Sequence, residues 1–98
     1  MATRHQLLLR EAADKESLAA AFMRYARGLA GAFDGIPARP ADCESYWKGP
    51  AAERYLTQVV RLRRELADLE DSCLATADNL RRRAATLRAT AATIPTDP

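Results

Sequence analysis

The residue types that do chemistry in enzymes occur here without the neighbours that such chemistry needs. His5 is the only histidine, and no cysteines or carboxylates cluster near it at a metal-ligand spacing. The serines and Cys43 lack a histidine that a recognisable motif would place as their base; the serines are Ser17, Ser45 and Ser72. We therefore expect a protein that is not an enzyme and that binds neither a metal nor a cofactor.

Two arginine groups raise a second hypothesis, a small helical protein that binds nucleic acid. They comprise Arg61, Arg63, Arg64, Arg81, Arg82 and Arg83. An acidic stretch over residues 65–71 lies between them and interrupts any basic stripe along a phosphate backbone. No aromatic side chain interleaves with the arginines to stack on bases, and a formal net charge of +2 is too mild to require an anionic partner. Binding of nucleic acid is therefore a weaker hypothesis than a helical adaptor or chaperone that binds another protein.

The elements that carry these residues are expected to be helical throughout. The 98 residues are 48% hydrophobic, 29% charged and only 6% aromatic, a composition that favours helix over sheet. Gly and Pro gather at residues 34–40 and return at Gly49-Pro50, so one connector separates two arms. We predict one all-α domain over 1–98, an antiparallel helix-turn-helix hairpin. Its parts are a first helix at about 5–33, a connector at 34–49, a second helix at about 50–92 and a tail at 93–98.

Large apolar residues of the first arm follow the period of one helix face. At spacings of four and three, they are Leu18, Phe22, Tyr25, Leu29 and Phe33. A cap at Asp14 or Ser17 fits this pattern, and so does an earlier start near residue 5. Gly28 and Gly31 lie inside the pattern, where they either weaken the helix by up to about 1 kcal/mol each or permit a second helix to approach closely.

The second arm begins with clear helix-start signals and continues as a long heptad pattern. Pro50 suits the first helical position, and Glu53 lies in the first turn, where the helix dipole favours an anion. The predicted seam comprises Ala52, Tyr55, Val59, Leu62, Leu66, Leu69 and Cys73, then, after a four-residue stutter, Ala77, Leu80, Ala84, Leu87, Ala91 and Ile94. Such a helix would have about 43 residues and a length of about 60 Å.

This second helix is longer than the first one can cover, so part of its seam needs another chain. Two helices also cannot bury stripes this wide without stacking against a second pair. We therefore expect two hairpins to pair into a four-helix bundle. The expected interface residues are Leu18, Phe22, Leu29, Phe33, Val59, Leu62, Leu66, Leu69, Leu80 and Leu87.

A Trp-x-Gly triplet, Trp47-Lys48-Gly49, lies directly before Pro50 and the second helix. A chain of about a hundred residues with two helices and Trp-x-Gly in the turn between them resembles the WXG superfamily of type VII (ESX) secretion proteins. The resemblance covers the whole chain as architecture, and Trp47 and Gly49 as motif. It implies a non-enzymatic helical hairpin that pairs into a four-helix bundle and is either exported or serves as the targeting partner of an exported toxin.

One departure from the family pattern bears on the expected partner. Many exported members carry a Tyr-x-x-x-Asp/Glu signal after the second helix, and here no tyrosine lies beyond Tyr55. The resemblance therefore favours a heterodimer with another WXG-like hairpin or with the helical N-terminal domain of a toxin. In that complex this chain contributes Trp47 and Gly49, and the partner contributes the Tyr-containing tail; a homodimer is the alternative.

The expected location follows from what the N-terminal region lacks. It has no long apolar stretch before a small-residue cleavage site, and no run approaches the roughly 18 apolar residues of a membrane span. We expect synthesis in the cytoplasm without membrane insertion. The resemblance adds type VII export together with a partner, or retention as a targeting factor, as open alternatives.

Overall fold

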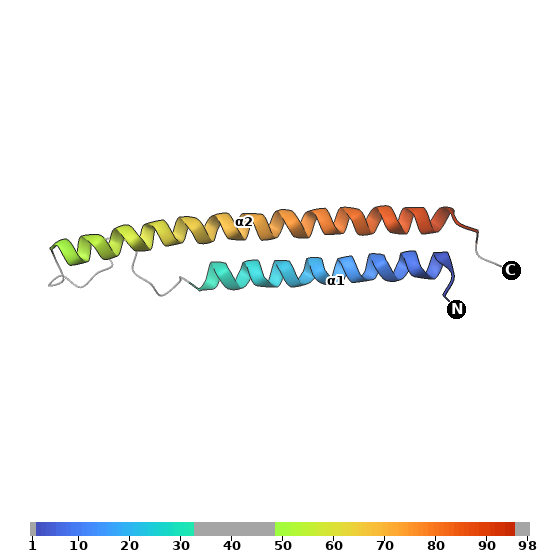
Figure 1. The fold of residues 1–98 in the computed structure, drawn as a ribbon, viewed down its shortest axis with the longest axis horizontal. Helices are drawn as coiled ribbons and strands as arrows, with labels where there is room; N and C mark the ends of the chain where they lie inside the picture. The colour runs from blue at the N-terminus through green and yellow to red at the C-terminus, as the bar shows by residue number, and fades with distance from the viewer. Residues whose placement is uncertain (1, 33–48, 96–98) are drawn as a thin grey trace.

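Two long antiparallel helices form the whole of the described structure (Figure 1). The computed structural model describes residues 2–32 and 49–95. Helix α1 spans Arg4–Gly31 and helix α2 spans Pro50–Thr93, with no strand in these two ranges. The predicted all-α hairpin is confirmed. Of the connector, Gly49 alone is described, so Trp47 lies outside the described residues. Phe33, at the end of the predicted first helix, also lies outside them.

Helix α1 begins with a capping box that the sequence pattern did not single out. The Thr3 hydroxyl accepts a hydrogen bond from the Gln6 backbone N–H at 3.1 Å, and the Thr3 N–H donates to the Gln6 side-chain oxygen at 3.0 Å. Two N–H groups that a helix start leaves without partners are satisfied in this way. Asp14 and Ser17 lie inside the helix, so the earlier start is correct and a cap at either residue is wrong.

Helix α2 begins at a backbone conformation that only glycine adopts readily. Gly49 has φ 105° and ψ −174°, and Pro50 follows it at the first helical position. Glu53 lies in the first turn, and its N–H donates to the Gly49 carbonyl at 3.1 Å. The start of α2 therefore depends on the Gly-Pro pair and has no side-chain cap.

Small side chains, mainly alanines, form the buried seam between the two helices. In α1 the buried residues recur every seven positions, at Ala12, Ala19 and Ala26. In α2 they are Ala52, Val59, Cys73, Ala77, Ala84 and Ala91. Cys73 is a free thiol packed in this seam. Heptad spacing keeps one stripe of each helix facing the other, as the sequence predicted, and the residues in it are the smallest of the predicted stripe.

Three contacts between the helices fix their register. The Glu16 carboxylate pairs with Arg88, the Arg81 guanidinium contacts the Met23 thioether, and the His5 ring nitrogen Nδ1 donates to the Ala91 carbonyl at 2.9 Å. The His5 contact sets the level of the two helices, because the long side chains of the other two pairs lean toward each other along the helix axes. Alanine thus meets alanine in two successive layers, 12 with 84 and 19 with 77, and His5 meets Ala91 one heptad before them.

The glycines of α1 do not serve this approach. A Cβ built at Gly28 or Gly31 would meet nothing within 4 Å, so the expectation that they permit close helix contact is wrong within this hairpin. Both residues are exposed. Their effect is the other one considered, a weaker helix.

The hairpin is elongated and its core is thin. Its extents are 77 × 18 × 15 Å and its radius of gyration is 22.2 Å, against about 13 Å for a compact domain of this length. Helix α2 has 44 residues and α1 has 28, so the first part of α2 extends past the end of α1 (Figure 1). No large side chain in the described ranges is fully buried.

Candidate protein-interaction surface

Most large apolar residues of the two helices lie beside the seam on one common side of the hairpin, while Val60 and Leu74 lie on the other side. On α1, Leu18 precedes a seam alanine by one position and Phe22 follows it by three, and Tyr25 and Leu29 repeat this around Ala26. On α2, Leu80 and Leu87 each follow a seam alanine by three. Positions one before and three after a residue lie on the same side of it in a helix.

The cross-helix contacts show that the two stripes share a side. Arg81 and Arg88 each follow a seam alanine of α2 by four, and they meet Met23 and Glu16 on the other side of the seam. Since the helices are antiparallel, the remaining side of α1 lies next to the remaining side of α2. We call the shared surface the leucine flank: Leu18, Phe22, Tyr25, Leu29, Leu62, Leu69, Leu80 and Leu87. Leu66, seven residues from Val59 and from Cys73, lies in line with the seam itself.

This flank remains largely open to solvent. Leu18 is 49% exposed, Leu62 47% and Leu69 42%, and the other predicted interface leucines and Phe22 are half-buried. Of the predicted interface residues in the described ranges, only Val59 is buried. A fully buried large apolar side chain contributes roughly 1.5–3 kcal/mol, and the isolated hairpin realises only part of this. The surface that the sequence predicted to be an interface is therefore still available.

The opposite side of the seam carries charged residues that make specific contacts of their own. Arg88 donates two hydrogen bonds to the Glu16 carboxylate, Nε to Oε2 at 3.0 Å and Nη2 to Oε1 at 2.5 Å. These hydrogen bonds hold the pKa of Glu16 below its usual value and raise the pKa of Arg88. Both side chains remain about half exposed, so the pair orients the helices more than it stabilises them.

His5 has a structural role that the sequence pattern missed. It lies seven residues before Ala12, in line with the seam, and its hydrogen bond to Ala91 ties the start of α1 to the end of α2. Extending the alanine heptad backwards would have found it. The ring is bound to a backbone carbonyl and is not part of a metal-ligand cluster; the described residues contain none.

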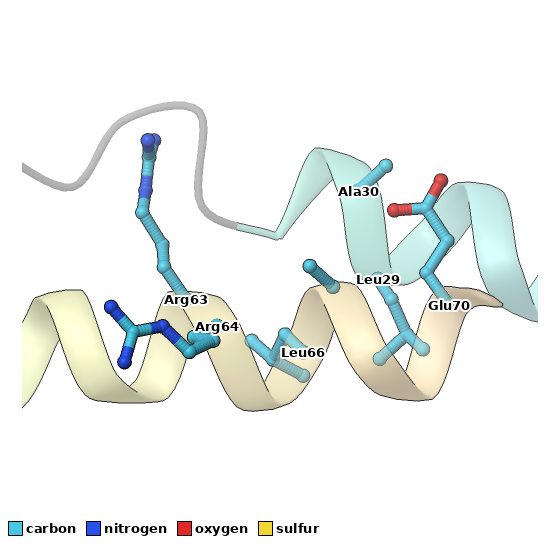
Figure 2. A pocket seen from close by; sticks show the side chains of 7 residues that line it. Leu29, Ala30, Arg63, Arg64, Leu66 and Glu70 are labelled. Carbon is cyan, nitrogen blue, oxygen red and sulfur yellow. The ribbon is translucent and has the colours of Figure 1, made fainter. Parts of the chain in front are cut away.

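A groove of about 460 Å³ opens where α1 ends against α2 (Figure 2). Leu29 and Leu66 form its apolar part, and Arg63, Arg64 and Glu70 place both charges around it. The Arg63 side chain extends away from α2, as Figure 2 shows. This lining has no nucleophile or histidine and brings together no catalytic set. Ala30 and Arg63 each follow a seam residue by four, as Arg81 and Arg88 do, so the groove opens mainly on the side opposite the leucine flank.

No known relative guides the interpretation further. Comparisons with protein families, with curated proteins and with solved structures found no match.

The arginines of α2 do not form one basic stripe. Arg81 faces Met23 and Arg82 pairs with Asp78 at 3.1 Å, while Arg83 lies a further position around the helix. None of the helices in the described part is long and apolar enough to cross a membrane. Gly49 and Pro50 start α2 as described above, and Trp47 of the same motif lies outside the described residues.

Proposed function

We propose that this protein is a non-enzymatic, WXG-like helical subunit of type VII secretion that works by pairing with another helical hairpin into a four-helix bundle. The observation that carries the proposal is the leucine flank. Its large apolar side chains are placed side by side by the register of α1 and α2, and the hairpin leaves them open. Monomeric proteins rarely expose a continuous apolar stripe of this kind without a partner for it.

The alanine seam supports the same proposal on energetic grounds. Alanine pays little entropy on burial but removes little apolar surface from water, and a small chain has few other sources of stability. A bundle of four helices would bury the leucines that lie beside the seam. Trp47 and Gly49 add the secretion part of the proposal through the resemblance, with a second WXG-like chain or a toxin domain as partner.

The pairing is tested with two aspartate variants on the same helix. Leu69 lies on the leucine flank and Leu74 on the other side of the seam, and both are 42% exposed. By size-exclusion chromatography with light scattering, we expect Leu69→Asp to be monomeric and Leu74→Asp to assemble as wild type does. Circular dichroism should show both variants helical. Equal assembly of the two variants would mean that the flank is not the interface.

The secretion part is tested separately, in the source organism. We expect deletion of the gene to remove at least one type VII substrate from the culture filtrate, and Trp47→Ala to have the same effect while the purified variant still assembles. A deletion strain with an unchanged set of exported proteins would point to a helical adaptor unrelated to secretion.

A further inference from the structure

The leucine flank of α2 has the same spacing in both chain directions. Leu62 and Leu69 are seven residues apart, Leu80 and Leu87 are seven apart, and eleven residues separate the two pairs. Tyr55 and Ile94 each extend the pattern by seven more. A stripe with symmetric spacing matches a copy of itself that runs antiparallel, which is the arrangement that a two-fold axis across the helix generates.

We propose that the occupant of the leucine flank is a second copy of this chain, paired through α2 about a two-fold axis that crosses α2 between Cys73 and Thr76. This proposal rests on the proposed function, because the second copy occupies the same surface. It specifies the partner as another copy of this chain. In this register Leu69 meets Leu80 of the second copy, and Leu62 meets Leu87 of the second copy. The more exposed leucines, Leu62 and Leu69, are thus covered by the half-buried ones.

The charges beside the flank fit this register. Glu65 and Arg83 follow Leu62 and Leu80 by three residues, and both are exposed. Antiparallel pairing brings Glu65 within about one residue of the level of Arg83 of the second copy, and the symmetry repeats the pair. If instead Leu69 met Leu87, Leu80 would face Thr76 and Glu65 would lie away from Arg83. Apolar matching and charge complementarity therefore select the same register.

The hairpin also has enough spare surface for such a dimer. It exposes 7415 Å², whereas a compact monomer of 10.8 kDa exposes about 5,500 Å². The difference exceeds the roughly 800 Å² that each partner buries in an interface of standard size. A second copy pairing along α2 can draw on this excess without any change in the fold of the hairpin.

Charge reversal tests the register. Wild type, purified alone, should be a dimer by light scattering. We expect Glu65→Arg and Arg83→Glu each to raise the dimer dissociation constant about tenfold or more, since each places like charges together twice. The double variant E65R/R83E should return close to wild type. A wild type that stays monomeric, or a double variant no better than the single ones, would overturn the proposal.

Cysteine cross-linking checks the same register independently of the charges. In a chain that carries Cys43→Ser and Cys73→Ala, Leu69→Cys mixed with a tagged Leu80→Cys chain should form a disulfide-linked pair under mild oxidation. Leu69→Cys with Leu87→Cys reports the shifted register, and Leu62→Cys alone should not link to itself, because its copies would lie about 37 Å apart. Cross-linking in either control, without the expected pair, would contradict the proposed axis.

These outcomes separate the two proposals. A chain that is monomeric alone, yet binds a different hairpin in a way that Leu69→Asp abolishes, would refute self-pairing and keep the proposed function. A chain that is monomeric and whose Leu69→Asp variant binds every tested partner normally would refute both.

Discussion

The alanine seam and the leucine flank share one heptad period but differ in side-chain size, and the difference separates folding from association. In the seam, Ala19 and Ala84 are buried almost completely because the two helices approach closely there. On the flank, Leu18 lies one position from Ala19 and is 49% exposed. Small residues thus set the distance between the helices, and the large residues that do not fit between them stay exposed or half-buried beside the seam.

The largest expected effect comes from enlarging a seam residue. Ala19→Leu inserts a side chain where α1 and α2 have no room for it, so we expect a loss of about 1–3 kcal/mol in the free energy of unfolding. The neighbouring Ala20 is exposed, and Ala20→Leu should change stability by no more than about 0.5 kcal/mol. Urea unfolding followed by circular dichroism, at one protein concentration, measures both. Equal losses would show that the seam is not the tight contact.

The next effect concerns Gly49, which fixes where α2 begins and therefore where its seam and flank residues lie. Its φ of 105° is strained for any residue with a Cβ, although the space around it is free. Gly49→Ala should cost about 1–3 kcal/mol by thermal or urea unfolding. Gly28→Ala, at an exposed site inside α1, should instead stabilise the hairpin by about 0.5–1 kcal/mol. A neutral Gly49→Ala would mean that this backbone conformation is not required.

The hairpin itself was predictable from the sequence because its signals are local. Gly49-Pro50 and the heptad pattern of α2 mark the start and the period of a helix without reference to the rest of the chain. The Thr3 capping box is also a local signal. It lies before the large apolar stripe from which the start of α1 was predicted. The sequence was therefore sufficient for the fold and insufficient for one boundary.

Local signals did not predict which residues of the stripe would lie in the seam and which on the flank. Ala84 and Leu87 both belong to the predicted stripe, and periodicity alone does not say which of them faces the other helix of the same chain. That choice depends on how closely α1 and α2 approach, a tertiary property set by successive layers of alanine acting together. The predicted seam held alanines and leucines together, and the structure buries the alanines and leaves the leucines beside them.

A smaller effect is expected at His5, which closes the open end of the seam. His5→Ala removes the hydrogen bond to Ala91 and should cost about 1 kcal/mol. Hydrogen exchange should show faster exchange of amides in the last turns of α2, with amides near Gly49 unchanged. Arg10→Ala, at an exposed position of α1, is the matched control and should leave exchange at both ends as in wild type. A uniform change along α2 would contradict a local tie.

The smallest expected effect lies on the charged side of the seam, at Glu16. Arg88 lowers the pKa of Glu16, so the pair stabilises the folded state above the pKa of the carboxyl in the unfolded chain. That contribution is lost as the pH falls through the lowered pKa of the folded state. Glu16→Gln should therefore be slightly less stable than wild type near pH 7, and the difference should vanish once the pH lies below the lowered pKa of Glu16 and shrink in high salt. Thermal unfolding of both proteins across this range, at matched concentration, measures it. A difference that persists in acid would mean that Glu16 stabilises the folded state through packing and not through its charge. The charged side of the seam would then contribute apolar contacts, as the leucine flank does.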